Sequence, residues 1–378
     1  MIMRRTAPAE PSEPVEPVPS LSLSFPRGST PRGRTLNPPI HTNHFQKETL
    51  MKKHAIFALA AASSLLLFSG CGAAPLKSGS HPPVTKSGWV VSWDREKGWE
   101  AYDKTKERWG SISYFAVTFD EKGELKVPSD LPKTAGIPFH LTFVNDVIRS
   151  NGHSIEKDTD ILRHVLRDEH ACRMHVKEIL AIAETCGADG IDIDYERIGK
   201  DPKLVEAFAR FTKLLYVESI PTHKKIRIIL EPSMPMDVSY SVGPEYVVML
   251  YNLYGLHSGP GPKADGPFIE KTIQRMQALP GKKAVAFSNG GCLWKDAGLF
   301  GLLKGTPRFI TTAEAVKLRD AHGAKEERDE ASAALHFSYQ EDGHSYEVWY
   351  ADEETLEAWT TLAANRGIPS VSLWRLGG

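Results

Sequence analysis

Three acidic residues alternate with apolar residues between positions 188 and 196 of the chain. Successive side chains of a β-strand point to opposite faces, so Asp192, Asp194 and Glu196 would share one face. A buried strand with that pattern predicts a functional cavity; the alternatives are an exposed strand edge and a calcium loop. The run lacks the Gly and the Glu that a helix–loop–helix calcium loop needs at its sixth and twelfth positions, which argues against the calcium loop. Crowding should leave at least one of the carboxyls protonated near neutral pH, as a general acid requires.

From residue 88 onward, short apolar strands alternate with amphipathic helices, which is typical of βα units and a parallel sheet. Eight such strands in about 290 residues fit an α/β fold of the (β/α)8 TIM-barrel type. The segment at about 295–350 is too long for a loop and contains a predicted hairpin. We interpret it as a small α+β insertion between strands seven and eight. The predicted strands are residues 89–93, 112–119, 139–144, 190–195, 226–230, 246–251, 283–287 and 371–374.

Residues 189–196 read Asp-Gly-Ile-Asp-Ile-Asp-Tyr-Glu and resemble the DGxDxDxE signature of glycoside hydrolase family 18, the chitinases and their relatives. Residues 249–252 are similar to the M-x-Y-D strand end of that family. Residues 371–377 resemble its last barrel strand, and the stretch from residue 347 to that strand is similar to the bacterial branch that acts on cell walls and spore cortex. The resemblance covers about residues 88–378 and implies a closed barrel.

The resemblance implies a retaining glycosidase in which the substrate itself supplies the nucleophile. Glu196 would protonate the leaving oxygen while the 2-acetamido carbonyl attacks the anomeric carbon and forms an oxazolinium ion. Asp194 would orient the acetamido group, Asp192 would share a proton with Asp194, and Tyr251 would donate a hydrogen bond to the acetamido oxygen. The implied substrates are glycans that contain N-acetylglucosamine, of the peptidoglycan or chitin type, cleaved at β-1,4 bonds.

Five further residues are candidates for sugar binding. The resemblance implies that Trp374 presents its face to the sugar, with Met249 packed beneath it. Asn252 stands where the family has Asp, and we expect a changed pH optimum or a changed preference for the neighbouring sugar, because Asn carries no charge. Trp294 and Trp349 either line the cleft or belong to the core.

The charge balance excludes one class of function. With 46 basic and 47 acidic side chains the formal net charge is −1, whereas a nucleic-acid-binding protein shows a basic excess. We expect no cofactor. We also expect no metal, because the His residues between 164 and 175 lack the spacing of a helical zinc site. With Cys71 set aside, three of the four cysteines remain, and this odd number argues against a disulfide framework: Cys172, Cys186 and Cys292. A non-catalytic carbohydrate-binding protein remains the alternative to the enzyme.

The first 70 residues have a different composition from the rest. Residues 1–50 are rich in Pro, Ser and Arg, which predicts disorder. Residues 51–70 begin with a basic stretch and continue with an apolar run, as a secretory signal does. A signal normally lies at the N-terminus, so we interpret Met51 as the true start and residues 1–50 as a mis-assigned extension.

The signal-like segment ends in Leu-Phe-Ser-Gly-Cys, which resembles the lipobox of bacterial lipoproteins. Cys71 would then be lipidated and would anchor the protein to a membrane; an ordinary signal peptide and a buried helix are the alternatives. Residues 71–87 would form a tether to the barrel domain at 88–378. The expected location is therefore the bacterial cell envelope, at the outer membrane or the cell surface, after export.

If translation starts at Met51, residues 1–50 are absent from the protein in its native host. Intact-protein mass spectrometry of the native material should give a mass without that segment. Detection of residues 1–50 would contradict the interpretation.

Overall fold

The structure is a computed structural model that describes residues 75–129, 131, 136–296 and 307–378. These residues belong to one compact unit, which spans Cys71–Gly378. The predicted disordered segment, the signal and Cys71 lie outside the described residues. Within the described ranges, every helix is too short or too polar to cross a bilayer.

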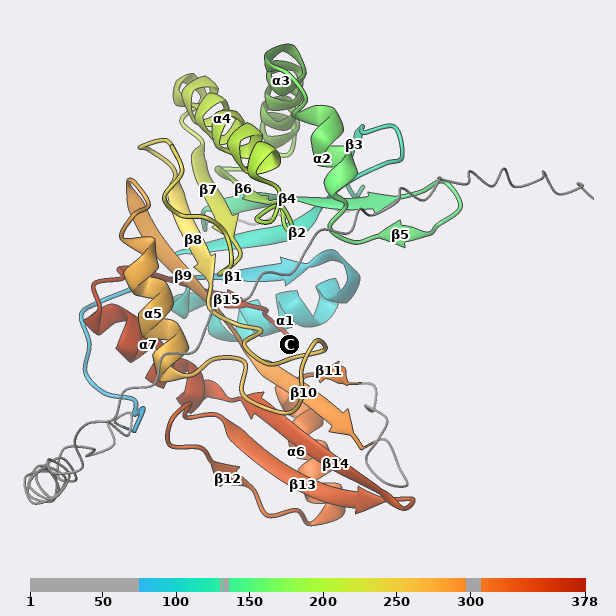
Figure 1. The fold of residues 1–378 in the computed structure, drawn as a ribbon, viewed down its shortest axis with the longest axis vertical. Coiled ribbons are helices and arrows are strands. Elements are labelled where there is room, and N and C mark those ends of the chain that lie inside the picture. The colour runs from blue at the N-terminus through green and yellow to red at the C-terminus, as the bar shows by residue number, and fades with distance from the viewer. Residues whose placement is uncertain (1–74, 130, 132–135, 297–306) are drawn as a thin grey trace, which may run out of the picture. The chain divides into compact units, whose positions relative to one another are not determined.

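Eight parallel strands form a closed barrel, which confirms the predicted fold (Figure 1). Each strand pairs with the next, and the last pairs with the first, through registers such as Gly88 with Leu373. All eight predicted strands are present. In chain order they are β1 (Thr85–Val91), β2 (Ser111–Phe119), β4 (Phe139–Ile148), β6 (Gly190–Asp194), β7 (Lys225–Leu230), β8 (Glu245–Met249), β9 (Lys282–Ser288) and β15 (Ser370–Trp374).

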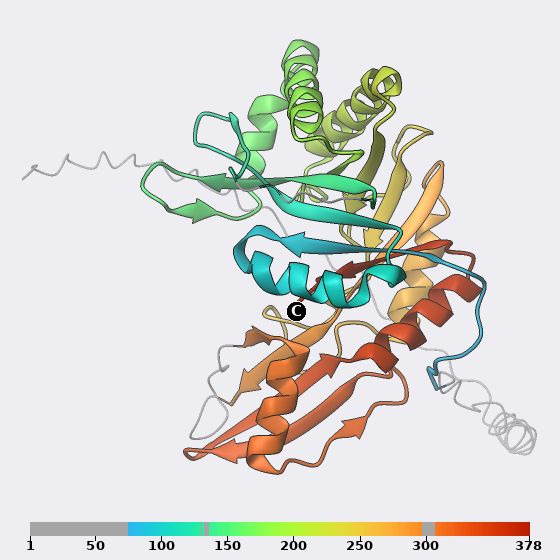
Figure 2. The ribbon, with the colours of Figure 1, turned by 180° about the vertical axis from the view of Figure 1, so that it is seen from behind.

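Helices follow the strands and cover the outside of the barrel. Most of them start at an aspartate whose carboxylate accepts a backbone N–H of the first turn, as Asp158 and Asp265 do. Figure 2 shows α1 (cyan) running alongside β1 (blue). The helices are α1 (Arg95–Thr105), α2 (Thr159–Val165), α3 (Glu169–Thr185), α4 (Pro202–Ser219), α5 (Gly266–Met276) and α7 (Glu353–Asn365), with 3-10 turns η1 (Ser92–Asp94), η2 (Lys106–Arg108) and η3 (Ile220–Thr222).

Two barrel strands continue into short hairpins. Strand β2 pairs with β3 (Leu125–Lys126), and β4 pairs with β5 (Ser154–Ile155). Strand β4 runs four residues beyond the predicted end at residue 144, because Val147 and Ile148 form ladder pairs with β5. The chain that returns from this hairpin therefore reaches the carboxyl end of β6.

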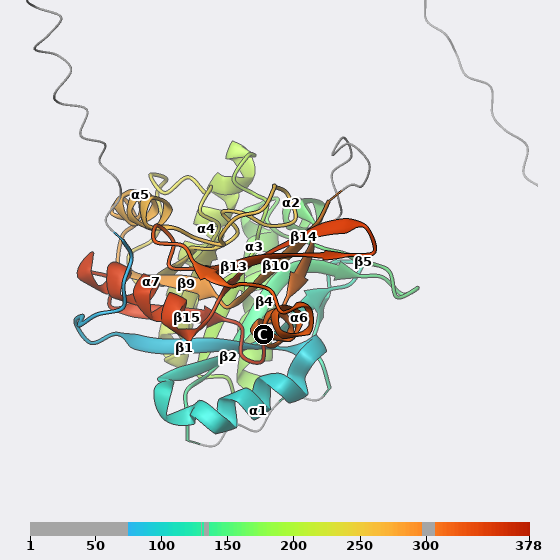
Figure 3. The same cartoon turned by 90° about the horizontal axis from the view of Figure 1, so that it is seen from below.

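The predicted α+β insertion between the seventh and eighth barrel strands is confirmed. It begins at Gly290 and not near residue 295, because only Asn289 separates β9 from the first strand of the insertion. Asp342 and Gly343 both have positive φ (49° and 74°) and form the predicted hairpin turn, which suits a two-residue turn. The antiparallel sheet has the order β11-β10-β14-β13-β12 (Figure 1). Figure 3 shows its strands β10, β13 and β14 from below. Its elements are β10 (Gly290–Lys295), β11 (Arg308–Ile310), α6 (Thr312–His322), β12 (Glu327–Arg328), β13 (Leu335–Glu341) and β14 (His344–Ala351).

Strand β6 separates two apolar clusters. Ile191, Ile193 and Tyr195 are buried in the large cluster between the barrel and its helices. A smaller cluster fills the barrel interior, where Met249 is one of the members. Asp192 and Asp194 are buried as well but belong to neither cluster. The alternation along β6 therefore places its acidic residues inside the barrel, as the sequence pattern predicts.

Asp192 is paired inside the barrel. Its carboxylate has no exposed surface, and Oδ1 lies 2.9 Å from His140 Nδ1 while Oδ2 lies 3.5 Å from Arg227 Nη1. Arg227 also donates to Ser372 Oγ at 2.7 Å. Burial acts to raise the pKa of Asp192, but the Arg227 charge and the His140 hydrogen bond outweigh it and hold the pKa below the ordinary value. These contacts therefore favour the ionised form of Asp192.

Replacing Arg227 by Met should leave the Asp192 charge buried without its cation. Removal of one partner of a buried pair costs about 3–5 kcal/mol of folding free energy. Urea unfolding of R227M measures this loss. The matched control is Arg173→Met, which breaks an exposed pair with Glu169 and should change stability little. Equal stability of R227M and the unchanged protein would contradict the role given to Arg227.

Candidate active site

Five of the predicted site residues come together at the carboxyl ends of the barrel strands, where barrel enzymes have their active sites. Asp194 ends β6 and Glu196 follows two residues later. Tyr251 follows β8 by two residues, and Trp374 ends β15. Tyr251 and Trp374 pack against the interior cluster that contains Met249. Burial and the nearby Asp194 and Glu196 carboxyls raise the pKa of Tyr251 well above its ordinary value, so its hydroxyl remains a hydrogen-bond donor at neutral pH.

Asp194 is a buried carboxyl with unused hydrogen-bonding capacity. It is 6% exposed, and its Oδ1 has no hydrogen-bond partner. Burial and the neighbouring Glu196 raise its pKa well above the ordinary value, although the Lys157 charge opposes them. This agrees with the expectation that one of the crowded carboxyls holds a proton. No hydrogen bond joins Asp194 to Asp192 among the described residues, so the shared proton stays a prediction.

Glu196 is held at both its backbone and its side chain. Its N–H donates to Asn145 Oδ1 at 2.9 Å, and its carbonyl accepts from Asn145 Nδ2 at 3.1 Å. Its Oε2 lies 2.5 Å from Lys157 Nζ. Burial raises the pKa of Glu196; the Lys157 ammonium opposes this, while Glu231 and Asp146 reinforce it. A carboxyl balanced in this way can both give and take a proton.

Trp374 lies in a group of aromatic rings. Its ring centroid is 4.9 Å from that of Phe115 and 6.1 Å from that of Trp89, both edge-on. Trp93, at 6.4 Å, is 62% exposed, whereas Trp89 is buried. The peptide bond between Trp374 and Arg375 is cis. Trp89 is thus part of the core, and Trp93 and Trp374 are the aromatic residues of this group at the rim.

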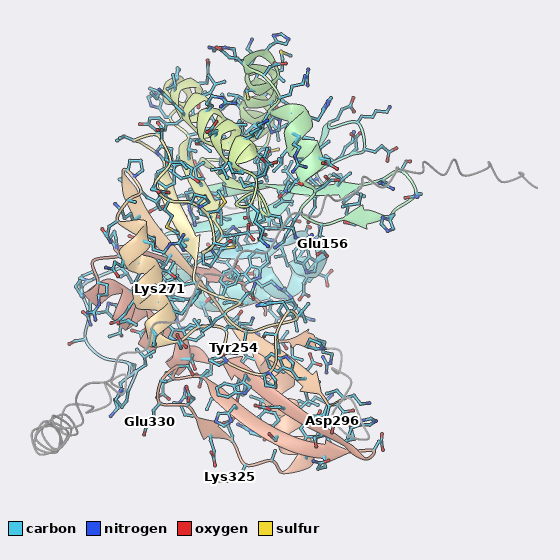
Figure 4. The ribbon with its side chains drawn as sticks, viewed as in Figure 1. Glu156, Tyr254, Lys271, Asp296, Lys325 and Glu330 are labelled. Atoms are coloured by element: carbon cyan, nitrogen blue, oxygen red, sulfur yellow. The ribbon has the colours of Figure 1, made fainter. Side chains whose placement is uncertain are left out.

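Asn252 opens a loop that spans residues 252–265. It is exposed, with a φ of 62°. Figure 4 labels Tyr254 on this loop, between the barrel and the sheet of the insertion. Lys263 fixes the other end of the loop, where its Nζ donates to Ser288 Oγ at 2.8 Å and to the Asn289 carbonyl at 2.9 Å. Burial lowers the pKa of Lys263 to about 8. The effect of Asn252 on pH dependence stays a prediction.

The two tryptophans of the insertion have different surroundings. Trp294 is buried, and its Nε1 donates to the Ser258 carbonyl of the loop at 3.0 Å. Trp349 is half-buried, stacks on His336 with the centroids 4.3 Å apart, and donates to Glu347. The placement of Trp294 favours the core alternative, because little of its ring faces solvent. For Trp349 both alternatives remain.

One of the histidines considered above, His175, lies in the core. His175 is buried against Tyr195, with its Nε2 2.7 Å from the Tyr195 hydroxyl, and burial lowers its pKa to about 3. Across the ranges that the structure describes, no group of three or more His, Cys, Asp or Glu residues could hold a metal ion. Cys172 and Cys292 are buried free thiols, and Cys186 is a half-buried one.

Sequence reasoning missed several residues of the site. Glu231 directly follows the predicted fifth strand, and Asn145 directly follows the third, so their rim positions could have been recognised. Arg227 is a lone charge inside an apolar strand, which signals a buried partner. Lys157 carries no such signal, because its place depends on the hairpin between β4 and β5.

Comparisons with known proteins agree with this architecture. No protein-family model matches the chain. The cortical fragment-lytic enzyme of Bacillus anthracis is 25% identical over 285 residues, which are 70% of this chain and 64% of that enzyme. The chain therefore spans less than two thirds of that relative.

Solved structures of bacterial proteins are similar to the chain, among them the following two. The spore cortex-lytic enzyme SleL of Bacillus cereus aligns with a TM-score of 0.68 and 21% identity, over 79% of this chain and 72% of SleL. The C-terminal domain of a putative chitinase from Desulfitobacterium hafniense DCB-2 aligns with a TM-score of 0.65 and 17% identity. The alignment covers 78% of this chain and 94% of that domain. The fold is that of chitinase-like barrels. At these identities the likeness shows the fold alone.

Gly190 has a steric role beneath the site. A Cβ atom at this position would lie 2.6 Å from the His140 ring, which contacts Asp192. Gly190→Ala should push His140 off Asp192 and cost about 1–3 kcal/mol, as overpacking of a core does. Chemical denaturation measures the loss. Gly259→Ala is the control, because its Cβ would meet open space. Equal stability of the two variants would contradict the role of Gly190.

Proposed function

We propose that the protein is a retaining glycoside hydrolase that cleaves β-1,4 bonds next to N-acetylglucosamine in peptidoglycan- or chitin-type glycans. The observation that carries the proposal is the placement of buried Asp194, half-buried Glu196 and Tyr251 at the carboxyl ends of β6 and β8. Desolvation there raises the pKa of both carboxyls. Raised carboxyl pKa values at a rim position are what general acid catalysis needs.

In the proposed first step, Glu196 donates its proton to the glycosidic oxygen as the bond to the anomeric carbon breaks. The acetamido carbonyl oxygen of the sugar attacks that carbon, and an oxazolinium ion forms. In the second step, the Glu196 carboxylate takes a proton from a water molecule whose oxygen attacks the anomeric carbon. The bond between that carbon and the acetamido oxygen breaks, which opens the oxazolinium ring, regenerates the acetamido group and leaves the product with the original anomeric configuration.

The substrate is the proposed nucleophile because the carboxyls of β6 are unsuited to the role. Asp192 lies beneath the rim, in contact with Arg227 and His140. Asp194 has a raised pKa and is a poor nucleophile when protonated. A buried oxygen without a partner is costly, so Asp194 Oδ1 is available to accept the acetamido N–H of a bound sugar. Tyr251 would then donate to the acetamido oxygen, and Trp374 would support the sugar ring.

Peptidoglycan-derived glycans are the preferred substrate class within this proposal. The named activities of the cortex-lytic relatives support the choice. We further propose that lipidation of Cys71 anchors the protein in the cell envelope, close to such glycans. Asn252 remains our candidate for altered sugar preference at the neighbouring position.

The proposal predicts that Glu196→Gln lowers glycan cleavage by about 10²–10⁴-fold, as loss of a general acid does. The measurement is digestion of chitin oligomers and purified peptidoglycan, with products read by mass spectrometry. Glu184→Gln, which changes an exposed glutamate on α3, is the matched control and should retain activity. De-N-acetylated oligomers should resist cleavage, because they lack the attacking carbonyl.

The outcomes separate the two function classes. Cleavage by the unchanged protein, lost in E196Q, supports the glycosidase. Binding of these glycans without cleavage by either protein would overturn the proposal and favour the carbohydrate-binding alternative. Cleavage of de-N-acetylated oligomers would overturn the substrate-assisted mechanism alone.

A further inference from the structure

Lys157 contacts the carboxylate of the proposed general acid. Its Nζ lies 2.5 Å from Glu196 Oε2, and the two side chains are 33% and 13% exposed. Lys157 belongs to the segment that returns from the β4–β5 hairpin, where Figure 4 labels its neighbour Glu156. The contact is therefore a partly enclosed ion pair at the rim of the barrel.

The backbone around Lys157 is fixed in place. Lys157 has a φ of 56°, a conformation that few side-chain-bearing residues adopt, and its N–H donates to Asp146 Oδ1 at 2.8 Å. Asn145 Nδ2 donates to the Asp158 carbonyl at 3.1 Å, and the Asp158 N–H donates to the Asn145 carbonyl at 2.8 Å. Asn145 also holds the backbone of Glu196. One side chain thus positions both the acid and the segment that carries the lysine.

The other charges near Glu196 are mostly acidic. Arg197 does not reach the carboxyl, because its guanidinium donates to the Glu156 carbonyl and its N–H to Glu231. Lys157 contacts the Glu196 carboxylate, and Glu196, Asp194 and Glu231 all favour the charged form of Lys157. Titratable groups that interact electrostatically with Glu196 come from several elements: Asp146 on β4, Lys157 after β5, Asp194 on β6, Glu231 after β7 and Tyr251 after β8.

We propose that Lys157 is a positioning residue that sets the protonation equilibrium of Glu196 and so the pH range of catalysis; this rests on the proposed function above. In the first step the proton leaves Glu196 for the glycosidic oxygen, and the Lys157 ammonium stabilises the carboxylate that remains. In the second step that carboxylate takes the proton of water. Lys157 keeps its own proton throughout.

The direction of the effect follows from the charges. Burial, Glu231 and Asp146 raise the pKa of Glu196, and Lys157 opposes them. Without the Lys157 charge, the pKa of Glu196 should rise. A general acid works while protonated, so the alkaline limb of the pH profile moves upward with it. An adjacent opposite charge changes a carboxyl pKa by roughly 1–3 pH units, which sets the expected size.

The experiment compares Lys157→Gln with the unchanged protein by two readouts. The first is the pH profile of kcat/KM on chitin oligomers, whose alkaline limb should move upward by about 1–3 pH units. The second is the pKa of Glu196 from ¹³C-carboxyl NMR, with the Glu196 resonance assigned by its absence in E196Q. The NMR readout needs no activity, so it tests Lys157 even if the proposed function fails.

Two control variants separate charge from structure. Lys157→Arg keeps the cation and should retain the profile of the unchanged protein. Lys213→Gln removes an exposed lysine of α4 and should change neither readout. If Lys157→Gln does not fold, the reciprocal measurement applies: by linkage, E196Q should lower the pKa of Lys157 by a similar amount.

The proposal is overturned if Lys157→Gln folds and leaves the pKa of Glu196 unchanged. It is also overturned if E196Q leaves the pKa of Lys157 unchanged. A pKa that rises in a protein without glycosidase activity would support the coupling and reject the proposed function alone.

Discussion

The barrel encloses an ionised carboxylate, and much of its interior is arranged around that charge. Asp192 has no exposed surface, so its ionised form persists only with partners inside the barrel. His140 and Arg227 supply them, from two different strands. Arg227 also lies over the Trp89 ring, 5.1 Å from its centroid. Gly190 leaves room for the His140 ring, so strand β6 provides both the Asp192 charge and the space for His140, which contacts it.

The contacts with Arg227 and His140 make Asp192 different from the two acidic residues that follow it, Asp194 and Glu196. Asp192 is stabilised as a charge, whereas Asp194 and Glu196 are pushed towards their protonated forms. The difference arises from depth, since Arg227 and His140 contact Asp192 inside the barrel, whereas further carboxyls lie near Asp194 and Glu196 at the rim. The acidic residues of this run therefore serve two purposes: Asp192 is an internal charge, and Asp194 and Glu196 are carboxyls with raised pKa values at the rim. The outward-facing residues of the same run, including Tyr195, are buried in the large apolar cluster.

The sequence predicted the barrel because burial determines the strand pattern. In all eight strands and in the hairpin of the insertion, apolar residues recur with a period that can be recognised in a single sequence. Asp194 and Trp374 end such strands, and Glu196 and Tyr251 lie just beyond the ends of theirs. The partners of these residues were harder to predict. Lys157 reaches Glu196 only through a hairpin whose β5 strand is two residues long, and a strand that short has no recognisable period. Trp294 was ambiguous because its burial depends on contact with a distant loop.

The insertion shares its anchoring with the loop that follows Tyr251. Ser258 of that loop accepts a hydrogen bond from Trp294, and Lys263 is bonded to Ser288 and Asn289 at the junction of β9 and β10. The insertion is thus not an independent module that could be exchanged between barrels of this kind. Its removal would leave Ser258 without its donor and would cut the chain at the anchor of Lys263. A change in the insertion during evolution would therefore require a matching change in the loop beside the proposed catalytic tyrosine.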